Sequence, residues 1–505
     1  MTVEAQDEIV RAKPPCGPVD GARVNGVAVF KGVPYAEPPI GDRRWRRPGP
    51  PKDWTEPRPA MMVGPFCPQY DIDRFGLFKD IPMSEDCLYL NIWTPAADAK
   101  ARPVLFYIHG GGFAMGSGAT PIYAGEVLAA QHDVVVVTIN YRLSIFGLPP
   151  FAVHGSSEPT NLGLLDQIEA LRWIKRNIAA FGGDPGNVTL FGLSAGGWSI
   201  ISLCGMAEAK GLFHKAVAQS SSALTTLTDQ ARALATTAIL EKLHLPDVDP
   251  ERLMAASTED ILDAGEAAHR AWENELADLG DRYRPSMPQI DAVLPARPMD
   301  LATSPDTFRG PLLIGGTREE VGFNPFRSGV TFLEPYFRKA GCLKALEVIV
   351  GAPAAAAIWD GYEALTNRSE AQIGGMIRTA LDYTMPSIRF AEARAATAPT
   401  WMYQVTYAPA KVAAATHACD IVLWSGVLGP SGLVDFFYGE NGIGDLERRL
   451  SQTMREDLVA LARTGELPWD RYDRARRATR IYDIHPRIAF DPAAPERRIW
   501  DGAQL

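Results

Sequence analysis

The sequence predicts an α/β fold in which helices flank a mostly parallel central sheet. Short apolar runs at residues 104–108, 134–139 and 188–191 are bounded by glycine or polar residues. Such runs are typical of strands that are buried on both faces of a parallel sheet. Between the second and third runs, apolar residues recur at steps of three and four over residues 163–180, which predicts an amphipathic helix. A strand, a helix and a strand in this order form the βαβ unit of an α/β protein.

Further elements follow along the chain. Proline and glycine punctuate residues 14–41, which predicts an edge hairpin and loops ahead of the sheet. The later segments with regular patterns are helical composition at 225–285, a strand at 312–314, helical composition at 340–400, a strand at 402–407 and a helix at 446–464. No repeat and no linker rich in serine, glycine or proline divides the chain. We therefore expect one domain over residues 1–505, with substrate-pocket insertions at roughly 225–290 and 322–385.

The composition is that of a globular protein with an acidic charge balance. Of the 505 residues, 46% are hydrophobic and 22% are charged, which argues against disorder over most of the chain. Lysine and arginine total 50, and aspartate and glutamate total 60. The net charge of −10 gives no general attraction to nucleic acid or to an anionic membrane. No apolar run of about 18 residues predicts a transmembrane helix, and the N-terminus lacks the apolar core of a secretory signal. We expect a cytoplasmic protein, with a secreted mature form as the alternative.

A candidate nucleophile lies in the segment Gly192-Leu-Ser-Ala-Gly196, which fits the pattern G-x-S-x-G. The pattern alone is weak, because glycine and serine are common, and a tight glycine turn with an incidental serine is the plain alternative. Here a predicted strand precedes the segment, and an apolar run that can form a helix follows it. A sharp connection from strand to helix would expose the hydroxyl of Ser194, so the context favours a nucleophile.

A second glycine-rich segment, His109-Gly-Gly-Gly112, follows the predicted strand at 104–108. Glycine has no Cβ, so the backbone N–H groups of such a loop can approach an oxyanion closely. The same arrangement after a strand is described for lipases and esterases. A phosphate-binding loop is the competing interpretation, but the segment fits neither G-x-x-x-x-G-K-[ST] nor G-x-G-x-x-G. We expect His109 to orient the loop rather than to act as a base.

Several longer motifs surround these two segments. They are Phe30-Lys-Gly-Val-Pro-Tyr-Ala-Glu-Pro-Pro39, Ser84-Glu-Asp-Cys-Leu-Tyr-Leu-Asn91, His109-Gly-Gly-Gly-Phe113, Asn140-Tyr-Arg-Leu143, Asn161-Leu-Gly-Leu-Leu-Asp-Gln167, Asn177-Ile-Ala-Ala-Phe-Gly-Gly-Asp-Pro185 and Val188-Thr-Leu-Phe-Gly-Leu-Ser-Ala-Gly-Gly197. Together they closely resemble the type-B carboxylesterase/lipase family, the cholinesterase-like α/β-hydrolases, and among these the bacterial carboxylesterases of the p-nitrobenzyl esterase type. The resemblance covers nearly the whole chain and weakens in its second half. It implies the α/β-hydrolase fold.

The resemblance also implies a Ser-Glu-His triad. Gly316-Thr-Arg-Glu-Glu320 resembles the family's segment with the triad acid, which gives that role to Glu320. Thr416-His-Ala-Cys-Asp420 resembles the segment with the triad histidine, which is His417 here. The order Ser194, Glu320, His417 is nucleophile, acid and base, as in α/β-hydrolases. The plain alternatives are an exposed loop charge for Glu320 and a structural histidine for His417.

The implied mechanism needs neither a metal nor an organic cofactor. His417 would take the proton of Ser194 during attack on an ester carbonyl, while Glu320 would stabilise the imidazolium. The positions that match the family's three oxyanion donors are Gly111, Gly112 and Ala195. No cluster of histidine and cysteine has the spacing of a zinc site. Activity is expected to rise as His417 loses its proton near neutral pH.

The sequence departs from the family at positions near the expected site. Leu193 stands where glutamate commonly precedes the nucleophile, Val321 replaces a glycine after the acid, and Asp420 replaces a glutamate. Cys67 and Cys87 match the positions of the family's N-terminal disulfide. A pair of free thiols is the alternative that the sequence leaves open.

The function that the resemblance implies is hydrolysis of small-molecule esters with short to medium acyl groups, through a covalent acyl-enzyme. An amidase or carbamate hydrolase with the same triad is one alternative, because pocket shape decides which leaving group is accepted. A non-catalytic binding member of the family is another, but such members typically lose a triad residue. Candidates for the substrate pocket are Leu193, Phe323 and Trp424. The sequence does not indicate an oligomeric state.

Overall fold

The structure, a computed structural model, describes residues 8–70, 81–155, 158–224, 226–276, 284–321, 338–439 and 442–503. One sheet of 13 strands runs through these residues. Its strands are β1 (Ile9–Ala12), β2 (Val19–Val24), β3 (Val27–Pro34), β4 (Arg58–Pro59), β5 (Tyr89–Thr94), β6 (Arg102–Ile108), β7 (Val135–Ile139), β8 (Gly183–Leu193), β9 (Lys215–Gln219), β10 (Leu312–Thr317), β11 (Thr400–Val405), β12 (Ala478–Tyr482) and β13 (Arg487–Phe490).

The strand order across the sheet is β1-β2-β3-β5-β7-β6-β8-β9-β10-β11-β12-β13, and β4 pairs with β2. Each neighbouring pair from β7 to β12 is parallel. The strands from β1 to β5 along this order, and β13 at the other edge, pair with their neighbours in antiparallel fashion. This confirms the mostly parallel sheet that the sequence predicts.

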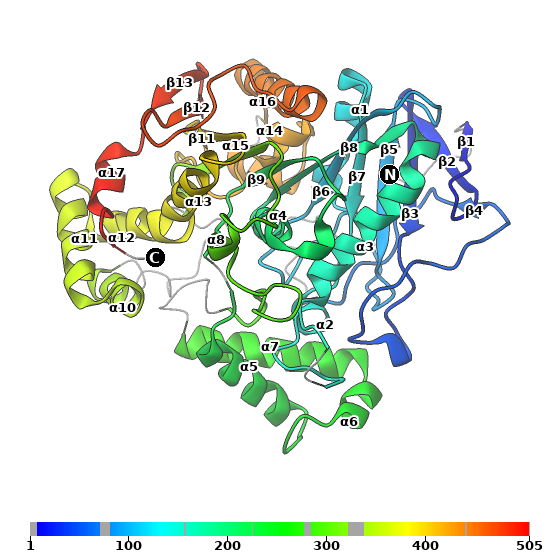
Figure 1. Ribbon diagram of the computed structural model, residues 1–505, viewed down its shortest axis with the longest axis horizontal. Helices are drawn as coiled ribbons and strands as arrows, with labels where there is room; N and C mark the ends of the chain where they lie inside the picture. The colour runs from blue at the N-terminus through cyan, green and yellow to red at the C-terminus, as the bar shows by residue number, and fades with distance from the viewer. Residues whose placement is uncertain are drawn as a thin grey trace.

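Helices cover both faces of the sheet (Figure 1). They are α1 (Glu126–His132), α2 (Ser144–Gly147), α3 (Leu162–Asn177), α4 (Ala195–Gly205), α5 (Asp229–Lys242), α6 (Pro250–Ala255), α7 (Thr258–Glu275), α8 (Pro298–Leu301), α10 (Lys339–Val350), α11 (Ala352–Leu365), α12 (Glu370–Thr379), α13 (Met385–Ala395), α14 (Ile421–Ser425), α15 (Gly432–Tyr438), α16 (Asp445–Thr464) and α17 (Ala494–Ile499). Side chains alternate across β6, as a strand requires. Phe106 and Ile108 join a core with α3, α4 and α13, whereas Leu105 and Tyr107 join a second core with α1, α14 and α16.

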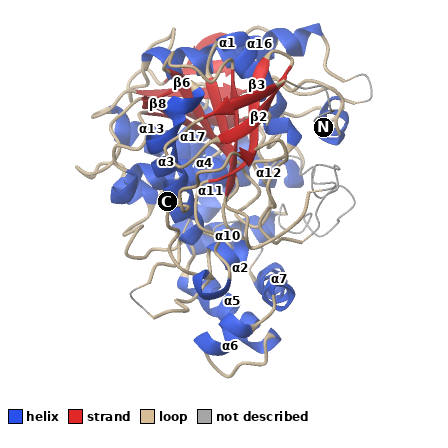
Figure 2. Ribbon diagram, turned by 90° about the vertical axis from the view of Figure 1, so that its right-hand side faces the viewer, coloured by secondary structure: helices blue, strands red, loops and turns tan. Residues whose placement is uncertain are grey.

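Helices α5, α6 and α7 form a group at one end of the molecule, away from the strands (Figures 1 and 2). They fall within the range 225–290, for which the sequence predicts helices, and α10, α11 and α12 fall within 322–385. The contribution of these two ranges to a substrate pocket stays a prediction. Among the described residues, no helix is both long enough and apolar enough to cross a membrane.

The predicted strands and helices coincide with observed elements, but β8 begins earlier than expected. It starts at Gly183 instead of Val188 and includes Pro185. Its pairing with β6 shifts between Arg102↔Gly183 and Val104↔Val188. The residues between these pairs form a bulge, so Pro185 does not have to donate a hydrogen bond to the ladder.

Candidate active site

The candidate catalytic residues follow three strands of the parallel part of the sheet. Ser194 directly follows β8, Glu320 lies three residues after β10, and His417 lies on the loop that follows β11. In the sheet, β8, β9, β10 and β11 are successive neighbours. Because the carboxyl ends of parallel strands meet at one edge, the three residues emerge along the same edge of the sheet.

Backbone hydrogen bonds at the end of β9 connect Ser194 to the loop that carries Glu320. The N–H of Ser194 donates to the carbonyl of Gln219 at 2.9 Å, and the N–H of Ser220 donates to the carbonyl of Gly315 at 2.7 Å. Gln219 and Ser220 are buried, so these bonds are shielded from water. The end of β9 therefore fixes the position of Ser194 relative to the segment that carries Glu320.

Ser194 occupies a strained turn between β8 and α4. Its φ of +58° and ψ of −123° lie in a region that residues with a Cβ rarely adopt. A Cβ on Gly196 would lie 2.0 Å from the carbonyl oxygen of Ile108, so only glycine lets the turn pack this closely against β6. Ser194 remains partly exposed while Ala195 is fully buried. This is the geometry that the sequence pattern predicts for an exposed nucleophile.

The glycine loop after β6 packs directly on this turn. A Cβ on Gly110 would lie 2.7 Å from the carbonyl oxygen of Leu193. Gly111 and Gly112 have φ values of +112° and +62°. Among the described residues, none accepts a hydrogen bond from the N–H of Gly111, Gly112 or Ala195. The three predicted oxyanion donors thus lie on two segments that meet at Ser194, the glycine loop and the start of α4.

The buried ring of His109 contacts both Tyr141 and the backbone of the glycine loop. Its ring stacks on Tyr141 with the centroids 4.3 Å apart, and its Nδ1 lies 2.8 Å from the carbonyl oxygen of Gly110. The hydroxyl of Tyr141 donates to the carbonyl of His109 at 2.8 Å. Burial lowers the pKa of His109 to about 4, so the ring is neutral at physiological pH. These contacts agree with the orienting role expected from the sequence.

Replacing Gly111 with alanine is expected to lower kcat by about 10²- to 10³-fold, the usual effect of losing one oxyanion donor. At φ +112°, a Cβ would lie 2.0 Å from the carbonyl oxygen of Met115, so the loop has to move. Steady-state kinetics beside thermal unfolding checks this, with Gly155→Ala as the control, because position 155 also has a positive φ but open space around it. A Gly111→Ala variant with wild-type kcat would show that this loop position does not hold the oxyanion.

Glu320 and His417 form a close pair. Oε2 of Glu320 lies 2.6 Å from Nδ1 of His417, and Oε1 of Glu320 accepts the N–H of Thr317 at 2.7 Å. The side chain of Glu320 is only 1% exposed, and that of His417 is 18% exposed. The carboxylate holds the proton on Nδ1 in the neutral ring, so Nε2 becomes the basic nitrogen.

Two further residues position this pair and are not among those that the sequence predicts for the site. The N–H of Thr317 fixes the carboxylate, and Glu319 fixes the histidine loop: its Oε2 accepts the N–H of Ala415 at 2.9 Å. Both lie in the segment that resembles the family's acid motif, which is a signal that could have indicated them. Their contacts explain why two consecutive glutamates have different roles.

A row of aromatic rings connects the histidine to the glycine loop. The ring of Tyr383 lies 5.3 Å from that of His417 and 6.3 Å from that of Trp198. Trp198 in turn lies 6.2 Å from Phe113, which follows Gly112. Such contacts restrict ring movement, so they help to fix the spacing between His417 and the glycine loop.

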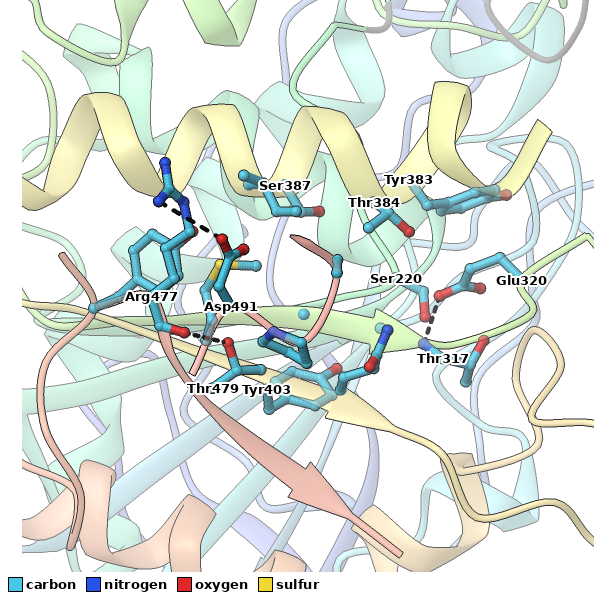
Figure 3. A pocket seen from close by; sticks show the side chains of 18 residues that line it. Ser220, Thr317, Glu320, Tyr383, Thr384, Ser387, Tyr403, Arg477, Thr479 and Asp491 are labelled. Carbon is cyan, nitrogen blue, oxygen red and sulfur yellow. Dashed lines mark hydrogen bonds and ion pairs between the residues drawn. The ribbon is translucent and has the colours of Figure 1, made fainter. Parts of the chain in front are cut away.

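A small cavity adjoins the far side of the acid (Figure 3). Ser220, Thr317 and Glu320 lie at one end, and Arg477 and Asp491 lie at the other. The space open to the centres of water molecules is about 40 Å³, which is room for a few water molecules. Its size suits hydration of the polar groups beside the acid rather than an acyl chain.

Two of the predicted pocket residues are buried in the core behind the site. Trp424 is 2% exposed and packs between Tyr403 and Tyr482, with centroids 5.4 and 5.5 Å away. Leu193 is 3% exposed and belongs to the same core cluster. Both side chains thus belong to the core and do not form an open pocket surface. Phe323, the third candidate, lies outside the described residues.

Asp420 is a buried carboxyl group close to the acid–histidine pair. Its Oδ2 accepts the indole N–H of Trp424 at 2.9 Å, and no described residue hydrogen-bonds its Oδ1. Burial, followed by the negative charge of Glu320, raises the pKa of Asp420 to about 6. Because its Oδ1 has no donor among the described residues, the ionised form of Asp420 is poorly compensated.

Replacing Asp420 with asparagine is expected to stabilise the protein at pH 8. A carboxyl group whose pKa is higher in the folded than in the unfolded state costs stability as pH rises from about 4 to 6. Above that window the cost is about 3 kcal/mol, and asparagine removes it. Thermal unfolding at pH 5 and pH 8 checks this, with the exposed Asp247→Asn as the control. A lower unfolding midpoint for Asp420→Asn at pH 8 would contradict the prediction.

Cys67 and Cys87 are both buried free thiols in the structure. The two side chains hydrogen-bond to each other, and this bond together with burial raises the pKa of Cys87 well above its ordinary value. The structure has the two cysteines as neighbouring thiols, and the disulfide that the resemblance implies stays a prediction. Within the described part of the chain, no group of three or more His, Cys, Asp or Glu side chains is arranged to hold a metal ion.

The parallel sheet, the serine turn after β8 and the acid–histidine pair after β10 and β11 define an α/β-hydrolase. The sequence profile of the carboxylesterase family matches residues 6–474, so the chain belongs to this family. It is 37% identical to the para-nitrobenzyl esterase of Bacillus subtilis (strain 168), over 95% of this chain and 96% of the relative. It is 31% identical to carboxylesterase 1D of Rattus norvegicus, over 88% and 84% of the two chains. The protein is a serine carboxylic-ester hydrolase.

Solved structures agree with this assignment. A PNB esterase structure superposes with a TM-score of 0.85 at 35% identity, covering 97% of this chain and 99% of the other. A carboxylesterase of Geobacillus stearothermophilus superposes with a TM-score of 0.83 at 32% identity, covering 97% and 100%.

Proposed function

We propose that the protein hydrolyses esters with short to medium acyl groups through a covalent acyl-enzyme on Ser194, with Glu320 and His417 completing the triad. The observation that carries this proposal is the 2.6 Å hydrogen bond between Glu320 and His417. Glu320 and His417 follow strands that end at the same edge of the sheet as the strained, partly exposed Ser194. All three groups are retained, which argues against a non-catalytic binding role.

The first half of the reaction forms the acyl-enzyme. Nε2 of His417 takes the hydroxyl proton as Oγ of Ser194 bonds to the ester carbonyl carbon, and the carbonyl oxygen becomes an oxyanion. The buried carboxylate of Glu320 stabilises the imidazolium. When the carbon–oxygen bond to the alcohol breaks, the imidazolium returns its proton to the leaving alkoxide.

The second half releases the acid. His417 takes a proton from water, the hydroxide oxygen bonds to the acyl carbon, and the bond to Oγ breaks as Ser194 regains a proton. The N–H groups of Gly111, Gly112 and Ala195 stabilise the oxyanion in both halves, because the fold holds these donors in place and Gly112 and Ala195 are buried.

Hydrolysis of p-nitrophenyl esters from acetate to octanoate tests the proposal. The expected result is turnover of the shorter esters and, on rapid mixing, a burst of p-nitrophenol close to the enzyme concentration. Mass spectrometry of quenched, digested enzyme should find the acyl group on the peptide that contains Ser194. Absence of hydrolysis by the folded protein, or an acyl group on another residue, would overturn the proposal.

A further inference from the structure

An arginine that the mechanism does not use contacts the glycine loop. A Cβ on Gly112 would lie 2.6 Å from Nη1 of Arg284 and 3.8 Å from its Cζ. The guanidinium therefore occupies the space that a side chain at position 112 would take. Because Gly112 donates to the oxyanion in the proposed reaction, this positive charge lies beside the position of the substrate carbonyl.

The segment that carries Arg284 is tied to the glycine loop. The hydroxyl of Ser286 donates to the carbonyl of Gly112 at 3.0 Å, and both groups are shielded from solvent. Farther along, the N–H of Gln289 donates to Oδ1 of Asn161 at 2.8 Å. The backbone that follows Arg284 is thus anchored at two points, Ser286 and Gln289.

The guanidinium itself packs on an aromatic ring. Cζ of Arg284 lies 5.3 Å from the ring centroid of Trp272, which is 3% exposed on α7. A guanidinium over an indole face is favourable and restricts the orientation of the fork. Arg284 is only partly exposed, so its charge acts in a less polar environment than bulk water.

We propose that Arg284 is a specificity-determining residue that selects esters carrying a carboxylate near the scissile bond, such as monoesters of dicarboxylic acids. The inference rests on the proposed function and adds a substrate class to it. A guanidinium has five N–H donors, so it can bind a carboxylate through two of them while it keeps its other contacts. The net charge of the chain is −10, so the selection is local and does not arise from long-range attraction.

The test compares matched pairs of anionic and neutral esters. Mono-p-nitrophenyl glutarate against p-nitrophenyl butyrate places the carboxylate on the acyl half, and 4-carboxyphenyl acetate against phenyl acetate places it on the alcohol half. For wild type, the ratio of kcat/KM should favour the anionic ester in one pair. Arg284→Leu is expected to lower that ratio by about 10- to 100-fold, the range of a charge-assisted hydrogen bond. Arg284→Lys should retain part of the preference, because it keeps the charge without the fork.

Arg270→Leu is the control, because it removes one positive charge from the exposed surface of α7, the helix that carries Trp272. Its ratio should equal that of wild type. Equal ratios for Arg284→Leu and wild type in both pairs would overturn the inference while the proposed function stands. A parallel fall for anionic and neutral esters would also overturn it, because Arg284 would then act on the oxyanion of every substrate. Failure of wild type to hydrolyse any of the esters would overturn the proposed function and the inference together.

Discussion

Replacing Ser194 with alanine is expected to lower kcat for ester hydrolysis by about 10⁴- to 10⁶-fold and to abolish the acyl-enzyme. The substitution is structurally mild. The hydroxyl of Ser194 makes no capping hydrogen bond to α4, and alanine keeps the same Cβ at φ +58°. The loss therefore reports the missing Oγ rather than a damaged turn. The oxyanion donors remain, so a small residual rate above that of water is expected.

Ser202→Ala is the matched control for this variant. Ser202 lies two turns farther along α4, where its buried hydroxyl donates to the carbonyl of Trp198 at 2.9 Å. It is expected to keep kcat close to that of wild type. Initial rates, burst amplitudes and thermal unfolding midpoints are measured for both variants. A Ser194→Ala enzyme with wild-type kcat and an unchanged midpoint would show that another group is the nucleophile.

The sequence predicts the centre of the sheet well because its strands are buried on both faces. Their apolar runs, such as 104–108 and 134–139, stand out against the surrounding residues. The edge of the sheet is less predictable. β12 contains Arg480, whose guanidinium packs against Trp469. This charged residue interrupts the strand, so no apolar run predicts it, although the strand pairs with β11 and β13. Tertiary pairing, not local pattern, defines such a strand.

The same distinction applies to the candidate site. The serine turn and the glycine loop are local features, since their conformations need particular residues at adjacent positions. The contact between Arg284 and Gly112 joins residues far apart in the chain and follows no motif, so the sequence does not reveal it. Trp424 is near His417 in sequence, but its side chain turns into the core to donate to Asp420. The position of Trp424 in the sequence therefore indicates the segment next to His417, but it does not indicate that the side chain points into the core.

Glu320→Gln is expected to lower kcat by about 10⁴-fold with little change in fold. The two oxygens of Glu320 accept from two donors, Nδ1 of His417 and the N–H of Thr317. An amide has only one oxygen. If that oxygen keeps Thr317, the NH₂ group faces Nδ1, and the ring proton moves to Nε2, where it blocks proton transfer from Ser194. If the oxygen faces Nδ1 instead, two donors oppose each other at Thr317 in a side chain that is 1% exposed.

Glu319→Gln separates this effect from damage to the loop. Oε2 of Glu319 accepts one N–H, that of Ala415, and an amide oxygen can accept the same bond. Its Oε1 accepts from the guanidinium of Arg318 at 3.0 Å. The side chain of Arg318 is 50% exposed, so it can turn to water when an NH₂ group takes the place of Oε1. We expect Glu319→Gln to keep kcat near that of wild type while Glu320→Gln loses it, with similar unfolding midpoints for both. Equal losses in the two variants would mean that the acid loop, and not the tautomer of His417, limits the reaction.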